Sequence, residues 1–377
     1  MRLIVRDFFE CVRKIPNLVQ RFSPNRKQIS VCDLALALRI PRCPRVAGNQ
    51  ERVMRIQIAS SFVTSAVVGL ATLVTAGCVA TEGAGNPTAS TPFVAPDLPV
   101  LAGQTATCSG PREKTFTLEA REATVDLGMG VHFSAWTYNG KLPGPTLEAC
   151  EGDRVTIVLS NHASTSHGLD SHALRTDMMH FGPIAPDGTL KIEKVVDTPG
   201  AYMYHCASGP VTDLHIKSGL TGAMIVYPRS QPLRPAHELV VVESGVYGDR
   251  DKTGLIPGTD PVRVQKNDPA LMMFNGRLEH APLIVKPGDL VRAYVVNVGP
   301  GVSAVHVMGL ILDTVHDGAT ELRNVQTYGI PAGSGAIVEF RIPERGMYGL
   351  VDHDRLSYVP YGMVIVFDAT GGMHDKV

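Results

Sequence analysis

The sequence predicts an all-β protein made of two tandem β-sandwich domains, and two observations support this prediction. The first is the strand pattern. Beyond residue 110, short runs rich in Val, Ile, Thr and Tyr alternate with Gly, Pro, Asp and Asn, as in "DRVTIVLSN" and "LVRAYVVNVG". No long segment with a helical period separates these runs, so the pattern is that of a sandwich of short strands.

The second observation is an internal repeat. The segment "YNGKLPGPTLEACEGDRVTIVLSN" (138–161) aligns with "FNGRLEHAPLIVKPGDLVRAYVVN" (274–297), and the Asn-Gly, Gly-Asp and final Asn fall at the same spacings. Further along, "PGAYMYHC" (199–206) is similar to "RGMYGLVDH" (345–353). Similarity in the same order over both halves indicates two copies of one domain.

The repeat and the composition divide the chain of 377 residues into segments. Met54 directly precedes a pattern typical of an export signal, so it is the expected true start. A polar, Pro-rich tether follows that pattern. We therefore expect an untranslated or non-structural preface at 1–53, a signal peptide at 54–80, the tether at 81–110, the first domain at 111–229 and the second at 237–370.

The export signal is predicted from an almost uncharged run, "IQIASSFVTSAVVGLATLVTAG" (56–77), that follows Arg55. Small residues before Cys78 resemble a bacterial lipoprotein cleavage box; cleavage shortly after Ala80 is an alternative, and a transmembrane helix is another. We expect a protein of the periplasm or the outer cell surface, lipid-anchored through Cys78 if the box is used.

Charge and cysteine content limit the partners and the redox compartment. The formal net charge of −1 gives no reason to expect nucleic acid as a partner. The two predicted domains and the end of the tether hold Cys108, Cys150 and Cys206. In an exported protein Cys108 and Cys150 can form a disulfide, which leaves Cys206 single; two buried thiols are the alternative.

His167, Cys206 and His215 form the first candidate metal site. Two imidazoles and one thiolate are the trigonal ligand set of a blue electron-transfer copper, whose remaining axial position takes a weak ligand. A wide gap from the first histidine to the cysteine, followed by a short loop to the second histidine, is typical of a cupredoxin.

His205 indicates a second site, because on an extended segment it faces the side opposite to Cys206. His172 is its natural companion, five residues beyond His167 in "HGLDSH". A third imidazole would come from His353, which stands at the matching position of the second repeat. Three neutral imidazoles with an open fourth position describe a catalytic metal centre.

With these residues in place, the chain resembles the copper-containing nitrite reductases over roughly residues 112–370. In the second domain, "SAVHVMGLILDTV" and "NVQTYGIPAGSGAIVEF" also resemble segments of that family. The resemblance implies two cupredoxin-type Greek-key sandwiches, with one type 1 and one type 2 copper in each protomer. The residues that match the family are the type 1 ligands His167, Cys206 and His215, the type 2 ligands His172, His205 and His353, the proton-delivering pair Asp170 and His306, and Met308 in the substrate pocket.

The same resemblance implies the activity and the assembly. Nitrite would be reduced by one electron to nitric oxide and water, with the electron passing from the type 1 to the type 2 copper. A small cytochrome c or a cupredoxin would supply that electron. The family forms homotrimers in which the type 2 site lies between subunits, so His353 would complete the site of a neighbouring protomer.

Leu220 departs from the family pattern. The position five residues after the second type 1 histidine holds methionine in the family, and leucine cannot ligate. Either the copper is three-coordinate, which should raise its reduction potential because a donor is missing, or the sulfur of Met224 or Met203 replaces it. The loop "SGPVTD" (208–213) also differs from the family and leaves the mode of donor docking open.

Two other functions compete. A laccase-like multicopper oxidase would hold its copper cluster largely in His-x-His pairs, and the sequence contains none. An electron-transfer cupredoxin without catalysis would need neither His172, His205 nor His353. Trp136 is interpreted as core packing beneath the first strand pair. Surface or loop roles suffice for the other histidines, His132, His162, His180, His237, His280, His316 and His374.

Overall fold

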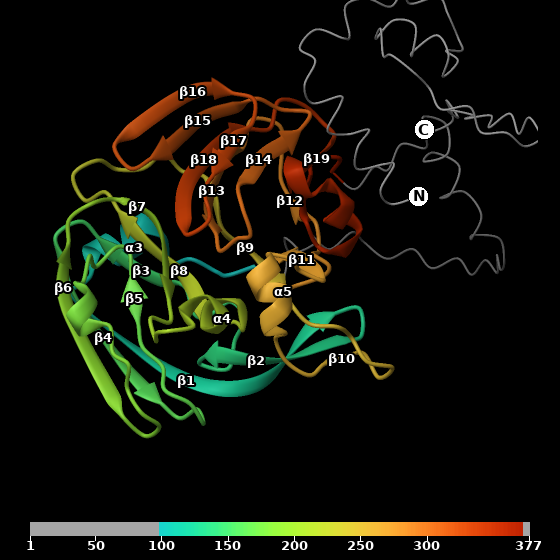
Figure 1. Ribbon diagram of the computed structural model, residues 1–377. Helices are drawn as coiled ribbons and strands as arrows, with labels where there is room; N and C mark the ends of the chain where they lie inside the picture. The colour runs from blue at the N-terminus through green and yellow to red at the C-terminus, as the bar shows by residue number, and fades with distance from the viewer. Residues whose placement is uncertain (1–97, 372–377) are drawn as a thin grey trace, which may run out of the picture. The chain divides into compact units, whose positions relative to one another are not determined.

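The computed structural model describes residues 98–371, which form two β-sandwiches (Figure 1). The predicted preface at 1–53, the signal peptide at 54–80 and most of the tether lie outside the described residues. Between residues 98 and 371 there is no helix long and apolar enough to cross a bilayer.

The first sandwich consists of two sheets that enclose one core. The larger sheet has the strand order β10-β2-β1-β4-β6, and the smaller has the order β3-β8-β7-β5. Their bounds are β1 Glu113–Gly128, β2 Val131–Tyr138, β3 Leu147–Cys150, β4 Asp153–Asn161, β5 Asp170–Ser171, β6 Thr189–Val196, β7 Gly200–His205, β8 Thr221–Tyr227 and β10 Leu255–Ile256.

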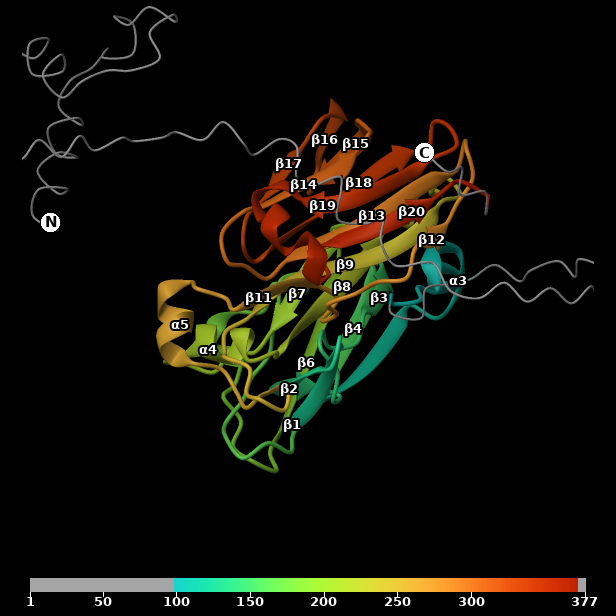
Figure 2. The same ribbon diagram turned by 90° about the vertical axis from the view of Figure 1, so that its right-hand side faces the viewer.

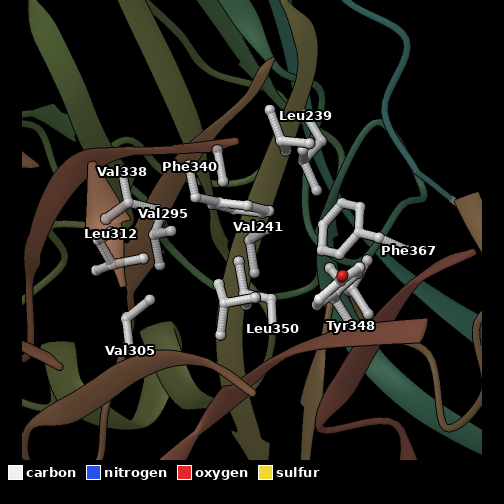
Figure 3. Packing of buried hydrophobic residues seen from close by; sticks show 14 of the residues in the cluster. Leu239, Val241, Val295, Val305, Leu312, Val338, Phe340, Tyr348, Leu350 and Phe367 are labelled. Atoms are coloured by element: carbon white, nitrogen blue, oxygen red, sulfur yellow. The ribbon is translucent and has the colours of Figure 1, made fainter. Parts of the chain in front are cut away.

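The second sandwich repeats this design with sheets of order β11-β9-β13-β18-β15-β16 and β12-β20-β19-β14-β17. Its core joins residues of both sheets, including Val241, Phe340, Leu350 and Phe367 (Figure 3). The strands are β9 His237–Val246, β11 Leu271–Phe274, β12 Leu283–Ile284, β13 Leu290–Asn297, β14 Ser303–Met308, β15 Leu312–Asp317, β16 Thr320–Val325, β17 Tyr328–Ile330, β18 Ser334–Arg341, β19 Met347–Asp352 and β20 Val364–Asp368.

The central strand pairings of the first sandwich recur in the second. β1 runs parallel to β4, and β9 runs parallel to β13. In the smaller sheets β3 is parallel to β8 and β12 to β20, while β7 and β19 each pair antiparallel with the strand that follows them. The predicted all-β fold with two tandem sandwiches is confirmed.

The repeated Asn residues have matching structural roles in both copies. Asn139 and Asn275 adopt φ angles of 56° and 50°, and the glycine after each also has a positive φ, as a tight hairpin turn requires. Asn161 and Asn297 are fully buried at the ends of β4 and β13. Each amide donates two hydrogen bonds to backbone carbonyls, so the same side chain has the same role in both copies.

Short helices join or flank the sandwiches (Figure 2). Helix α3, in the last part of the predicted tether, is tied to β3 by a disulfide between Cys108 and Cys150. Of the two interpretations of these cysteines, the disulfide is therefore the observed one. The helices are α3 Gly103–Ser109, η2 Met178–His180, α4 Thr212–Lys217, α5 Pro261–Lys266 and η3 His353–Tyr361.

Candidate metal centres

His167, Cys206 and His215 lie together inside the first sandwich, and we call them the Cys206 cluster. The Nδ1 atoms of the two imidazoles are 3.1 Å apart, and the Cys206 Sγ lies 3.7 Å from that of His167 and 3.4 Å from that of His215. All three side chains are buried. One sulfur and two nitrogens thus converge on a single point away from water.

Local packing holds the Cys206 cluster together. The backbone N–H of Gly168 donates to the Cys206 Sγ at 3.4 Å. A Cβ at Gly168 would collide with the carbonyl oxygen of Phe181, so only glycine permits this close approach. His215 lies on α4, and its Nδ1 faces the His167 Nδ1 and the Cys206 Sγ.

The protonation states of the Cys206 cluster suit a metal site. Burial, with a further contribution from His215, lowers the pKa of His167 to about 4, and burial also lowers the pKa of His215. Both rings are therefore neutral and able to ligate at neutral pH. Burial raises the pKa of Cys206 to about 11, so a metal that binds the thiolate must displace a proton.

Trp136 has a role that the sequence interpretation missed. It packs partly against the core as predicted, but its ring also meets both imidazoles edge-on, with centroids 5.3 Å from His167 and 4.8 Å from His215. No motif marked this contact, because it depends on how strand β2 lies against α4. The only signal in the sequence was that the chain has a single tryptophan.

Asp170, His172 and His205 form a second group, the His205 cluster. The Nε2 atoms of the two histidines are 3.1 Å apart, and the Asp170 Oδ2 lies 3.9 Å and 3.8 Å from them. Residue pairing between β5 and β7 sets Asp170 directly opposite His205. The first sandwich therefore brings one carboxylate and two imidazoles to a shared position.

Cys206 and His205 are neighbours in the chain but belong to different clusters, as the alternation of side chains on a strand predicts. The His205 Nδ1 lies 2.9 Å from the carbonyl oxygen of Cys206. A ring that donates there leaves its Nε2 free to ligate. Burial is the main cause of a lowered pKa at His205, which keeps the ring neutral.

The predicted histidines of the second sandwich lie close to one another. His306 on β14 and His353 at the start of η3 have ring centroids 5.6 Å apart. The His306 Nδ1 is 2.8 Å from the carbonyl oxygen of Gln326, and Met308 is 44% exposed on the same strand. Among the described residues, neither histidine belongs to the His205 cluster of its own chain.

The environment of Leu220 bears on the axial position. Leu220 is fully buried in the same core as Cys206, and its carbonyl oxygen accepts from the Cys206 backbone N–H at 3.0 Å. The Met203 side chain lies in another cluster, between the two sandwiches. The Met224 sulfur accepts a hydrogen bond from Ser171 at 3.6 Å.

Comparison with known proteins agrees with this architecture. A family model described as "Multicopper oxidase" matches residues 119–231. The chain is 34% identical over 256 residues to the copper-containing nitrite reductase of Neisseria gonorrhoeae, a match covering 64% of this chain and 65% of that protein. The solved structure of a copper nitrite reductase from Nitrosomonas europaea superposes with a TM-score of 0.63 at 31% identity, covering 69% of this chain and 95% of that chain. The chain belongs to the copper-containing nitrite reductase family.

As in this family, both sandwiches are of the cupredoxin type. A solved multicopper oxidase is also similar, with a TM-score of 0.59 at 25% identity over 68% of this chain and 89% of that one. The nitrite reductases are the more similar of the two groups. The chain spans 65% of the length of the Neisseria gonorrhoeae relative and 66% of a Neisseria meningitidis one.

Proposed function

We propose that this protein is a copper-dependent dissimilatory nitrite reductase that converts nitrite, one electron and two protons into nitric oxide and water. The observation that carries the proposal is the division of two adjacent residues, His205 and Cys206, between two clusters of metal-ligating side chains. An isolated electron carrier needs only the Cys206 cluster. A second cluster one peptide away fits a catalyst that receives its electron internally.

The donor sets fit copper. In the Cys206 cluster, His167, Cys206 and His215 would hold a type 1 copper, since one thiolate and two neutral imidazoles are its ligand set. His172 and His205 would hold the type 2 copper with a third histidine. When bound, copper supplies the one-electron chemistry at both positions and the binding site for nitrite at the second.

The electron route follows from the covalent geometry. The peptide between His205 and Cys206 is the shortest covalent path between the clusters. A small cytochrome c or cupredoxin would deliver the electron to the surface above His215. Exposed apolar side chains on η2 and at the N-cap of α4 support such docking: Met178 is 83% exposed, Met179 86% and Val211 49%.

Asp170 and His306 would deliver the two protons. Asp170 lies within 4 Å of both histidines of its cluster, so its carboxyl can hydrogen-bond to nitrite held there. With the His306 Nδ1 hydrogen-bonded to the Gln326 carbonyl, its Nε2 can take up and release a proton. Met308, on the same strand, would border the substrate pocket.

The site is incomplete within one chain, which supports a homotrimer. His353 is absent from the His205 cluster of its own chain, and it lies beside His306 on the other sandwich. A second copy that brings its His353 to this cluster would supply both the third ligand and the second proton donor. Each protomer of the trimer would then hold one type 1 and one type 2 copper, and isolated protomers would be inactive.

Leu220 makes the type 1 copper three-coordinate in this proposal. Met203 packs in a different cluster, and the Met224 sulfur is engaged by Ser171, so neither methionine is a good substitute. Loss of the axial donor should raise the potential. The protein would then need a donor of correspondingly high potential.

We also propose that the protein works in the periplasm or at the outer cell surface, attached by lipid at Cys78. The disulfide between Cys108 and Cys150 supports an oxidising compartment. Labelling of expressing cells with a radioactive fatty acid, in the wild type and in a Cys78→Ala variant, tests the attachment. Label that persists in the variant would contradict it.

Anaerobic turnover of the copper-loaded protein with nitrite, followed by electron paramagnetic resonance, tests the function. We expect two distinct copper signals and release of nitric oxide. His353→Ala should remove the type 2 signal and turnover but keep the type 1 signal. A single blue signal that the alanine variants of His172, His205 and His353 leave unaffected would instead indicate an electron-transfer cupredoxin. Oxygen consumption with phenols, without nitrite reduction, would indicate a multicopper oxidase.

A further inference from the structure

Lys217 is a buried cation close to the Cys206 cluster, and nothing in the proposed chemistry uses it. It lies two residues after His215 on α4 and is only 8% exposed. Its Nζ donates to the Asp213 Oδ2 at 2.9 Å, the Val264 carbonyl oxygen at 3.4 Å and the Asn267 Oδ1 at 2.6 Å. Three acceptors match the three protons of an ammonium group.

The acceptors join two separate parts of the fold. Asp213 is on α4 itself, whereas Val264 and Asn267 belong to α5 and its C-cap, in the segment between β10 and β11. The Nζ also lies 4.9 Å from the centre of the Tyr247 ring, just beyond β9. The two helices lie side by side in both ribbon views (Figures 1 and 2). Lys217 therefore ties α4 to the segment that leads into the second sandwich.

Helix α4 needs such an anchor. It has only six residues, and no side chain caps its N-terminus at Val211. A helix this short is not stable by itself, so tertiary contacts must hold it. By contrast, α5 begins with a side-chain cap from Asp260 and ends at Asn267 in the left-handed conformation. The better-defined helix can thus fix the weaker one.

We propose that Lys217 is a positioning residue for His215. The inference rests on the proposed role of His215 as a type 1 copper ligand. Removal of the ammonium group would break the hydrogen bonds to the Val264 carbonyl and the Asn267 side chain, which join α4 to α5. Helix α4 would relax away from α5, and the His215 Nδ1 would move relative to the Cys206 Sγ. The spectrum of a blue copper depends on that geometry, so it reports the shift directly.

The test compares Lys217→Met, which keeps the length of the chain, with Lys266→Met, the same change at an exposed lysine of α5. Asn267→Gly provides a milder variant, because glycine accepts its φ of 51° and removes only the acceptor. Each copper-loaded protein is measured by visible absorption, the type 1 paramagnetic resonance signal, the reduction potential and the rate of copper loss to a chelator.

We expect Lys217→Met and Asn267→Gly to change the type 1 absorption and resonance parameters and to weaken copper retention by about tenfold, as loss of an outer-shell partner does. Their effects should be non-additive when combined. Lys266→Met should match the wild type. If Lys217→Met does not fold, Asn267→Gly carries the test.

Two outcomes separate this inference from the proposed function. A wild-type spectrum and wild-type copper retention in Asn267→Gly and Lys217→Met, with only a lower melting temperature, would overturn the positioning role. If the wild-type protein itself shows no blue copper signal, the ligand assignment beneath the inference fails.

Discussion

Glu243→Gln should become more stable than the wild type by a margin that grows as the pH rises, and the reason lies in a buried pair of carboxyl groups. Glu243, on β9, is 1% exposed, and Asp352, at the end of β19, is fully buried. The Asp352 Oδ1 accepts from the backbone N–H groups of Ala304 and Asp354 at 2.8 Å and 2.9 Å. Burial and the charge of Asp352 raise the pKa of Glu243 well above its usual range.

The sign and the size of the effect follow from proton linkage. In the unfolded chain Glu243 ionises near its usual pKa of 4.5, whereas in the folded protein it keeps its proton. Above pH 4.5 the folded state therefore binds one proton more, and the free energy of unfolding falls by about 1.4 kcal/mol per pH unit until the folded carboxyl ionises. Glutamine keeps a carbonyl oxygen that can accept from the Ser303 hydroxyl, and it does not titrate.

Urea unfolding of the wild type and of Glu243→Gln, measured at pH 5, 5.5 and 6 in the same copper state, checks this. The stability difference should grow in favour of the variant by about 1.2 kcal/mol across that unit, slightly less than the limiting slope because the unfolded carboxyl is not fully ionised at pH 5. Glu279→Gln, the same change at an exposed position, should follow the wild type. A difference between Glu243→Gln and the wild type that stays constant across this range would refute the reasoning.

Three further predictions address the disulfide, the axial position and the proton supply. Replacing Cys108 and Cys150 by serine should lower the free energy of unfolding by about 4 kcal/mol, because the bridge spans 42 residues. In urea unfolding, dithiothreitol should destabilise the wild type but not the serine variant, and an equal effect on both would contradict this. Leu220→Met should lower the type 1 reduction potential in a redox titration, and an unchanged potential would mean that residue 220 is not axial. Asp170→Asn should slow nitrite turnover about 10²-fold or more while both copper signals persist; undiminished turnover would exclude Asp170 as a proton donor.

The sequence was sufficient for those features that depend on local spacing. The Asn-Gly turns and the buried terminal asparagines could be aligned between the halves, and the structure gives both copies the same turns and loop contacts. The division of His205 from Cys206 followed from strand alternation alone. Each of these features is set by residues that are close in sequence, so the local sequence pattern is enough to predict its geometry.

Features that depend on distant segments could not be predicted in the same way. The disulfide between Cys108 and Cys150 remained one of two interpretations, because its formation depends on where α3 lies against β3. The contact of Trp136 with two imidazoles and the anchoring of Lys217 require the docked positions of β2, α4 and α5. The separation of His353 from the His205 cluster is likewise set by the packing of whole sandwiches.

The matching ends of β7 and β19 suggest how the two copies diverged in rigidity. After β19, the carboxylate of Asp352 closes the strand end with two hydrogen bonds from the backbone. After β7, the corresponding corner contains Cys206 and two neutral imidazoles, which offer lone pairs to one another. The end of β19 is thus held by hydrogen bonds within the protein, whereas the end of β7 would be held by a bound metal ion. Hydrogen exchange should therefore slow more at the end of β7 than at the end of β19 when metal binds.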